Sequence, residues 1–192
     1  MVTIKLIDLA SYLKINGLKD IYQGRDGYFF QPVYQCCSYE EAIRIFGDVK
    51  GSNFFEKKGI YIPNVEIDVL FKDGEEIGQT EYVAELLKEQ GVEMFNKVVY
   101  ASFCLYHEEG HSVDFEESGL SIEEFIQRDC EDKDKLNLQM NYIRTLPENE
   151  RSVNIHLFYL MYNEMNAEKI ANIYAVKKVA ENLERILNFT IK

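Results

Sequence analysis

The sequence predicts an α+β protein, with a β-containing front half and a helical back half. In the front half, short β-prone runs are separated by turn residues. From Thr80 onward, apolar residues recur at the three- and four-residue spacing of helices. The chain of 192 residues is the size of one domain, so we expect a single domain over residues 1–192, with a small N-terminal sheet ahead of a helical C-terminal half.

The front half contains three expected strands: Tyr28–Tyr34, Gly59–Ile62 and Val65–Phe71. The first is rich in aromatic residues, which favour strands, and the other two flank a Pro-Asn break. Lys72-Asp73-Gly74 has the composition of a turn that follows the third strand. Ser38–Phe46 is expected to be a helix because Ser38 and Glu41 have the spacing of a capping box.

The back half is expected to hold five helices: Glu81–Gln90, Val92 to about Phe115, Ser121–Asp129, Arg151–Asn163 and Asn166–Leu187. Gly91 is a natural stop for the first, and Ser121 with Glu124 forms a capping box at the start of the third. The charged run Asp129–Lys135 is expected to lie in solvent.

The composition excludes several classes of function. The formal net charge is -12, and no cluster of Lys and Arg provides a basic face, which argues against direct binding of nucleic acid or anionic lipid. The longest apolar run, Val98–Tyr106, is too short to span a bilayer, and the amino terminus does not read as a secretory signal. The four cysteines lack a metal or disulfide spacing, so we expect a cytoplasmic protein with reduced thiols.

The pattern that carries chemistry is His107-Glu108-Glu109-Gly110-His111. Histidines four residues apart emerge from one face of a helix, where both imidazoles can bind one Zn²⁺ ion. Glu108 lies beside such a metal and can act as the general base and then the general acid of a hydrolysis. Gly110 leaves room for another element to approach closely. The sequence therefore predicts a catalytic zinc site on this helix.

A third protein ligand is expected from a helix further along the chain. Glu168 begins the run Glu-Lys-Ile-Ala-Asn-Ile-Tyr-Ala and would complete a His-His-Glu set, with Asn172 on the same face as a hydrogen-bonding partner of a ligand. Glu164 lies one helical turn earlier and is an alternative ligand. Glu117 is a weaker one, because Asp114 stands where the extended zinc motif has a glycine.

Together, H-E-x-x-H and E-x-x-A-N-x-Y-A resemble the two motifs of the ImmA/IrrE-like metallopeptidases, over roughly residues 59–179. The resemblance implies a zincin-like fold of the gluzincin type, with His107, His111 and Glu168 as zinc ligands and Glu108 as the catalytic acid/base. It also implies a protein substrate, commonly a helix-turn-helix repressor of a phage, mobile-element or stress-response system. In this chain a long acidic insertion, centred on Asp129–Lys135, separates the two motifs.

Other residues near the motifs have open roles. Asp114 is either a hydrogen-bonding partner of a ligand or a plain solvated residue, and Glu109 is expected to be a solvated charge. His156 is expected to be a structural histidine against the core, with stabilisation of a tetrahedral oxyanion as the alternative. Four tyrosines could donate to the same oxyanion, and the sequence does not choose among them: Tyr142, Tyr159, Tyr162 and Tyr174.

Two functions from different classes fit these patterns. The first is a zinc-dependent metalloendopeptidase that cleaves a specific protein partner, with an edge strand such as Val65–Phe71 pairing with the extended substrate. The second is a non-catalytic zincin-like module that acts by binding a repressor or toxin partner, with the acidic insertion as its docking surface.

Overall fold

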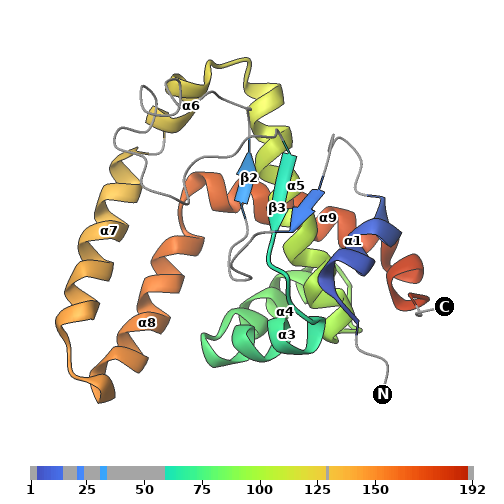
Figure 1. The fold of residues 1–192 in the computed structure, drawn as a ribbon, viewed down its shortest axis with the longest axis horizontal. Helices are drawn as coiled ribbons and strands as arrows, with labels where there is room; N and C mark the ends of the chain where they lie inside the picture. Colours follow the sequence, from blue (N-terminus) through green and yellow to red (C-terminus); the bar gives the residue numbers. More distant parts are fainter. Residues whose placement is uncertain (1–3, 15–20, 24–30, 34–58, 129, 190–192) are drawn as a thin grey trace.

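The computed structural model describes residues 4–14, 21–23, 31–33, 59–128 and 130–189, and over these residues the protein is mostly helical (Figure 1). The helices are α1 (Leu6–Leu13), α3 (Ile67–Glu76), α4 (Gln79–Glu89), α5 (Lys97–Ser118), α6 (Ile122–Arg128), α7 (Cys130–Thr145), α8 (Glu148–Asn163) and α9 (Asn166–Leu187). None of the described helices combines the length and the apolar character that a bilayer span requires.

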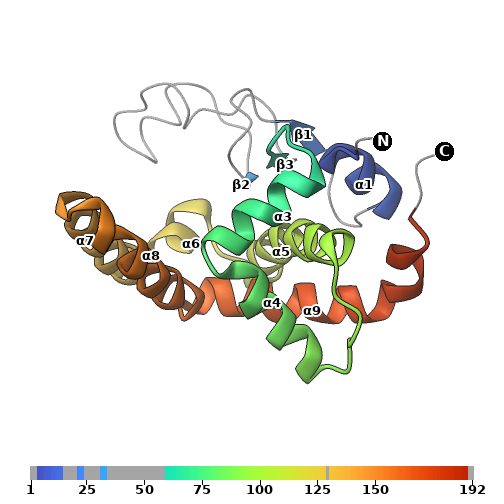
Figure 2. The ribbon, with the colours of Figure 1, turned by 90° about the horizontal axis from the view of Figure 1, so that it is seen from below.

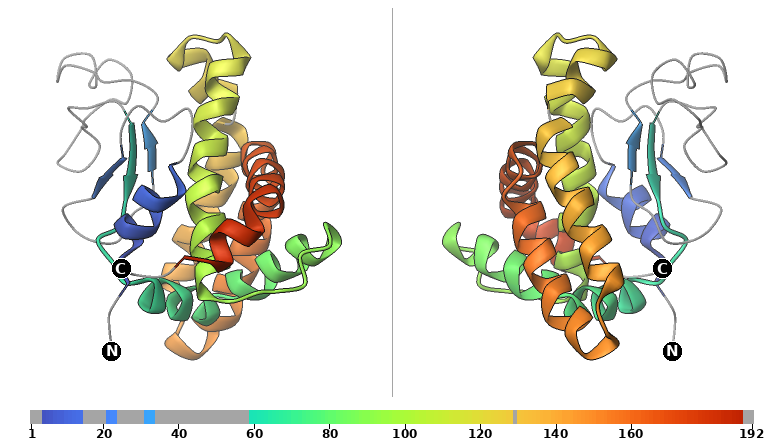
Figure 3. Two further views of the ribbon diagram at one scale, coloured as in Figure 1. Left: turned by 90° about the vertical axis from the view of Figure 1, so that its right-hand side faces the viewer. Right: turned by 90° about the vertical axis from the view of Figure 1, so that its left-hand side faces the viewer.

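A small sheet of three short strands lies on one side of α5 (Figure 3). Its order is β1 (Ile21–Gln23), β3 (Gly59–Ile62) and β2 (Gln31–Val33), with β3 parallel to β1 and antiparallel to β2. The strand predicted at Gly59–Ile62 is confirmed, and β2 falls inside the strand predicted at Tyr28–Tyr34. The helix predicted at Ser38–Phe46 lies outside the described residues.

The strand predicted at Val65–Phe71 is wrong, because this segment enters helix α3. The segment was expected to be a strand because it follows the Pro-Asn break, but Ile67, Leu70 and Phe71 are spaced by three and four residues and pack on the core as one helical face. Gly74, which was expected in a turn, lies buried in the same helix. A Cβ atom there would stand 2.3 Å from the Tyr100 hydroxyl oxygen, so the missing side chain lets α3 rest against α5.

The back half follows the predicted helices closely. Helix α5 begins later than predicted, at Lys97, because the side chain of Asn96 accepts hydrogen bonds from the backbone N–H groups of Val98 and Val99. The capping box between Ser121 and Glu124 is present at the start of α6. Gly91 follows α4 with a φ of +79°, a left-handed conformation that suits glycine.

The long insertion forms a pair of helices, α7 and α8, that stands away from the body of the molecule (Figures 1 and 2). The sequence missed α7: Lys133, Asp134 and Lys135 are exposed, as expected of a solvated charged run, but the run is helical. Within the pair, Leu136 and Ile143 of α7 are buried. Helix α8 then leads through a short turn into α9.

Helices α5 and α9 cross at the centre of the molecule, and glycine at position 110 allows the crossing (Figure 1). A Cβ atom on Gly110 would lie 2.9 Å from the Cα atom of Ala171 and 3.1 Å from the Cβ atom of Tyr174. Ala171 is fully buried, so a small residue on each helix brings the two backbones together. Val99, Leu105, Ala175 and Val179 extend this contact into the core on either side.

Replacing Gly110 with alanine tests this crossing. An interior Gly→Ala change ordinarily stabilises a helix by about 1 kcal/mol. Here the new methyl group meets backbone atoms that have no freedom to move away, so we expect G110A to lower the free energy of unfolding by roughly 1–3 kcal/mol. Urea denaturation measures the change, with E116A, an exposed position on the same helix, as control. A G110A protein as stable as the wild type would contradict the close approach.

Candidate metal site

Helix α5 places both histidines of the motif on one face near its buried centre. His111 is 7% exposed and Glu108 8% exposed, so neither side chain is a surface group. One turn separates His107 from His111, and their rings meet edge to face with centroids 4.6 Å apart. This is the arrangement that the four-residue spacing predicts for two imidazoles that can bind the same metal ion.

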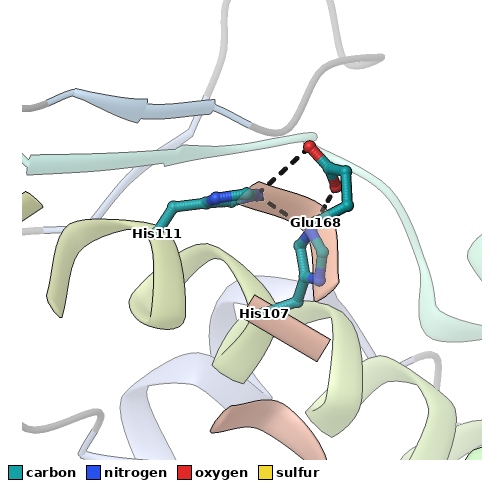
Figure 4. Close-up of side chains that lie close together, drawn as sticks. All are labelled: His107, His111 and Glu168. Atoms are coloured by element: carbon teal, nitrogen blue, oxygen red, sulfur yellow. Dashed lines mark hydrogen bonds and ion pairs between the residues drawn. The ribbon is translucent and has the colours of Figure 1, made fainter. Parts of the chain in front are cut away.

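Helix α9 adds the carboxylate of Glu168 to the two imidazoles (Figure 4). The Nε2 atoms of His107 and His111 are 3.0 Å apart, and one carboxylate oxygen of Glu168 lies 3.1 Å from Nε2 of His107. The other carboxylate oxygen lies 3.6 Å from Nε2 of His111. The three side chains therefore point at one another from two crossing helices and form a group that could hold a metal ion.

The spacing of these atoms fits a small tetrahedral cation. Ligand atoms about 2.0–2.1 Å from a tetrahedral centre are separated by about 3.3 Å from one another. The separations in the structure are 3.0, 3.1 and 3.6 Å, which bracket that value. Two neutral imidazoles and one carboxylate are also the donor set of zinc sites that keep a fourth position open for a substrate or water. The residues present therefore fit zinc.

Asn172 orients the first histidine. The Nδ1 atom of His107 lies 2.9 Å from the amide oxygen of Asn172, and the amide nitrogen of Asn172 donates to the Tyr82 hydroxyl over 3.4 Å. An amide oxygen only accepts hydrogen bonds, so the proton of neutral His107 is assigned to Nδ1, and Nε2 presents its lone pair to the cluster. The role predicted for Asn172 agrees with this contact, whereas Tyr82, on α4, was not anticipated.

The charges at the site stabilise one another. Burial alone would raise the pKa of Glu168, but hydrogen bonds and positive charge from His107 and His111 hold that pKa well below its usual range. Burial alone would lower the pKa of His107, yet the hydrogen bond that Glu168 accepts and the negative charge of Glu108 raise it. The site is therefore built to attract positive charge, whether a proton or a metal ion.

Glu108 stands beside the cluster as a buried carboxyl group. Burial raises its pKa, and the neighbouring imidazoles of His107 and His111 oppose that rise. A carboxyl group whose pKa is raised towards neutrality can accept and return a proton, as a general acid/base must. Glu108 is outside the group of described residues that could hold a metal ion, and its role as catalytic acid/base stays a prediction.

One tyrosine reaches the site from the helical insertion. Tyr162, near the end of α8, lies close enough to Glu168 and Glu108 for both carboxylates to act on its phenol group. Burial and these two carboxylates raise the pKa of Tyr162 well above its ordinary value, so the phenol keeps its proton. Tyr142, by contrast, is 55% exposed on α7. The sequence named Tyr162 only as one of four tyrosines, because nothing in its local pattern shows where α8 ends in space.

The alternative ligands lie elsewhere. Glu164 is exposed and pairs with Lys169, with 2.6 Å between the carboxylate oxygen and Nζ. Glu117 is exposed in the last turn of α5. Asp114 forms an ion pair with Arg128 of α6 at 2.6 Å, so it ties α6 to α5. His156 is exposed on α8 against Gly78, and the expectation of a core histidine is wrong.

Glu109 is the clearest correction, because it is 1% exposed and not a solvated charge. Neither of its carboxylate oxygens has a hydrogen-bond partner that meets normal geometry. Burial raises its pKa to about 7, and the nearby Lys178 ammonium and Tyr174 hydroxyl oppose this only in part. The prediction failed because α5 is covered on several sides and Glu109 lies near Lys178 and Tyr174 of α9.

Comparison with known proteins gives no independent assignment: no protein-family model, curated protein or solved structure matches this chain. The family resemblance therefore rests on the two motifs themselves. Their geometry is consistent with a zincin-like site, because His107, His111 and Glu168 converge as that resemblance implies.

Metal binding distinguishes the ligand assignments directly. We expect the wild-type protein to bind one equivalent of Zn²⁺, and H107A, H111A and E168A each to weaken binding at least about a hundredfold. E164A and E117A are matched controls, because they remove exposed carboxylates within one turn or two of the ligands. Competitive titration with a chromophoric chelator gives the affinities. Zinc retained by E168A, or lost from E164A, would refute the assignment.

The raised pKa of Glu109 predicts a pH-dependent stability. An acid whose pKa rises on folding destabilises the folded protein once it is ionised, so the cost is absent well below about pH 4.5 and complete above about pH 7. We expect E109Q to stabilise the metal-free protein by up to about 3 kcal/mol at pH 8 and by little at pH 5. Urea denaturation in the presence of a chelator measures both values. E116Q, exposed on the same helix, should change neither, and an equal gain from E109Q at both pH values would contradict the buried charge.

Proposed function

We propose that the protein is a zinc-dependent metallopeptidase with a gluzincin-like site of the ImmA/IrrE type. The observation that supports this most strongly is the convergence of His107, His111 and Glu168 from two helices that cross at Gly110. A chance H-E-x-x-H on a surface helix would have no reason to be buried. It would also have no reason to meet a carboxylate and an oriented amide from a helix 61 residues further on.

The three side chains would hold the zinc ion, which supplies a Lewis acid that polarises the scissile carbonyl group and activates water for attack. Asn172 keeps His107 in the tautomer that offers Nε2. Glu168 remains ionised over the physiological pH range, since its pKa lies well below the usual range. These residues would therefore provide two imidazole nitrogens and one anionic carboxylate as donors.

Glu108 performs the proton transfers in this proposal. Its carboxylate takes a proton from the attacking water and passes it to the leaving amine as the carbon–nitrogen bond breaks. A raised pKa serves both halves of the cycle, because the carboxyl group must be a base first and an acid afterwards. Tyr162 is the tyrosine we assign to the tetrahedral oxyanion, since its hydroxyl stays protonated and lies at Glu168.

The substrate we propose is a protein, and the motif resemblance points to a helix-turn-helix regulator. A DNA-binding protein carries basic surfaces, and a chain with a net charge of -12 attracts such a partner. The expected pairing of substrate with Val65–Phe71 is withdrawn because that segment is helical. Only β1 and β2 have an unpaired edge in the described sheet, since β3 is paired on both sides.

Substitution of Glu108 tests the mechanism. E108Q keeps the shape of the side chain but cannot accept the proton, so we expect unchanged zinc content and a loss of hydrolysis of about 10²–10⁴-fold. Cleavage of a mixed, quenched-fluorescence peptide library by the zinc-loaded protein measures the rate. E109Q is the matched control, because it alters the adjacent buried carboxylate outside the metal cluster. Wild-type turnover by E108Q would refute the mechanism, and zinc-loaded wild type without any turnover would favour the non-catalytic binding module.

A further inference from the structure

Helix α8 carries an uncovered row of apolar side chains. Val153, Leu157, Leu160 and Met161 are 66%, 49%, 56% and 42% exposed. Their spacing of four, three and one residues places them on one face of the helix, over a length of about 12 Å. We call these four residues the α8 apolar row. Single exposed apolar residues need no explanation, but an aligned row of four on one helix marks an interaction surface.

The opposite face of α8 makes the contacts that hold the helix in place. Phe158, Tyr159 and Tyr162 form one aromatic cluster on that side. Asn163, at the end of the helix, is buried and donates to the side chain of Gln79 on α4. These contacts anchor α8 through the face opposite the row, and Figure 2 shows the helix pair projecting away from the body.

The row is bordered by carboxylates. Glu150 precedes Val153 by three residues and Glu164 follows Leu160 by four, so both lie on the same helical face as the row. Glu81 of α4 lies at the Gly78 turn, beside His156 at the edge of the row. Two cations of the described part of the chain that lie near the row are engaged: Lys169 pairs with Glu164, and the Arg151 guanidinium donates to the backbone carbonyls of Arg144 and Leu146.

We propose that the α8 apolar row docks an amphipathic helix of a partner protein, one whose apolar stripe is flanked by lysine or arginine. A helix presents apolar residues at the same three- and four-residue spacing, so two such faces can pack along their lengths. Basic flanks place positive charge opposite Glu150 and Glu81. A second copy of this chain fits less well, because it would bring equivalent carboxylates together and each copy carries a charge of -12.

The position of the row links docking to the proposed peptidase site. Its last residue, Met161, precedes Tyr162, which lies near Glu168. The row faces away from Tyr162, so the docking surface and the metal cluster are joined through helix α8 itself, which carries both. That the docked segment belongs to the substrate rests on the proposed function, whereas the docking itself is measured without catalysis.

The probe is a fluorescein-labelled peptide of about 18 residues, built from leucine and lysine in helical periodicity. Binding to the full-length protein is followed by fluorescence anisotropy. Two further peptides distinguish the contribution of charge from that of apolar contact. One carries glutamate in place of lysine, and the other carries glutamine in place of leucine. The test variant is L157S/L160S. Its matched control is V69S/M94S, which removes two comparably exposed apolar residues, 40% and 58% exposed, away from α8.

We expect the leucine–lysine peptide to bind, to bind more weakly as salt rises, and to lose at least about tenfold in affinity with L157S/L160S but not with the control. Both altered peptides should bind the wild type at least about tenfold more weakly. Equal binding by L157S/L160S, equal binding of the glutamate peptide, or a dimer of the chain that L157S/L160S dissociates would each overturn the proposal. Docking without Glu108-dependent cleavage would sustain this surface and remove the peptidase function. Cleavage that depends on Glu108, without docking of the peptide on α8, would support the peptidase function and overturn the docking surface.

Discussion

The close contact between Gly110 and Ala171 is the constraint on which the rest of the structure depends. It lets the backbones of α5 and α9 approach until the main chain of Ala171 occupies the space that a side chain at position 110 would need. His107 and His111 lie within one turn of this contact on α5, and Glu168 lies within one turn of it on α9. A wider crossing would move Glu168 away from the imidazoles, so the packing of two small residues sets the dimensions of the metal cluster.

The same crossing concentrates ionisable groups in a desolvated place, which is costly unless their charges are balanced. Glu168 and the two imidazoles balance one another through a shared set of short contacts. Glu109, on the neighbouring side of α5, has no comparable partner and its pKa rises to about 7. The two carboxylates at the crossing therefore differ in charge state. Glu168 stays ionised because positive charge is available to it, and burial pushes Glu109 towards its neutral form.

The motifs predicted the chemistry of the site better than they predicted the fold around it. The four-residue spacing of the histidines and the Glu-Ala-Asn pattern concern a single helix each, so Glu168 and Asn172 could be named from local sequence alone. The error at α3 arose because a short amphipathic segment fits two periods, and only its packing on α5 decides between them. Tyr82 and Tyr162 reach the site from other helices, and no local pattern reports such long-range contacts.

The helical insertion belongs to the site as much as the two motif helices do. Helix α8 is fixed at its end by Asn163, and it is this end that brings Tyr162 to Glu168. One face of α8 thus reaches the metal ligands while the opposite face presents Leu157 and Leu160 to solvent. A partner on the exposed face would rest on the same helix that carries Tyr162, so the proposed docking surface and the cluster share a single element. An insertion that served only as a spacer would have no reason to place an aromatic hydroxyl at one end of an apolar row.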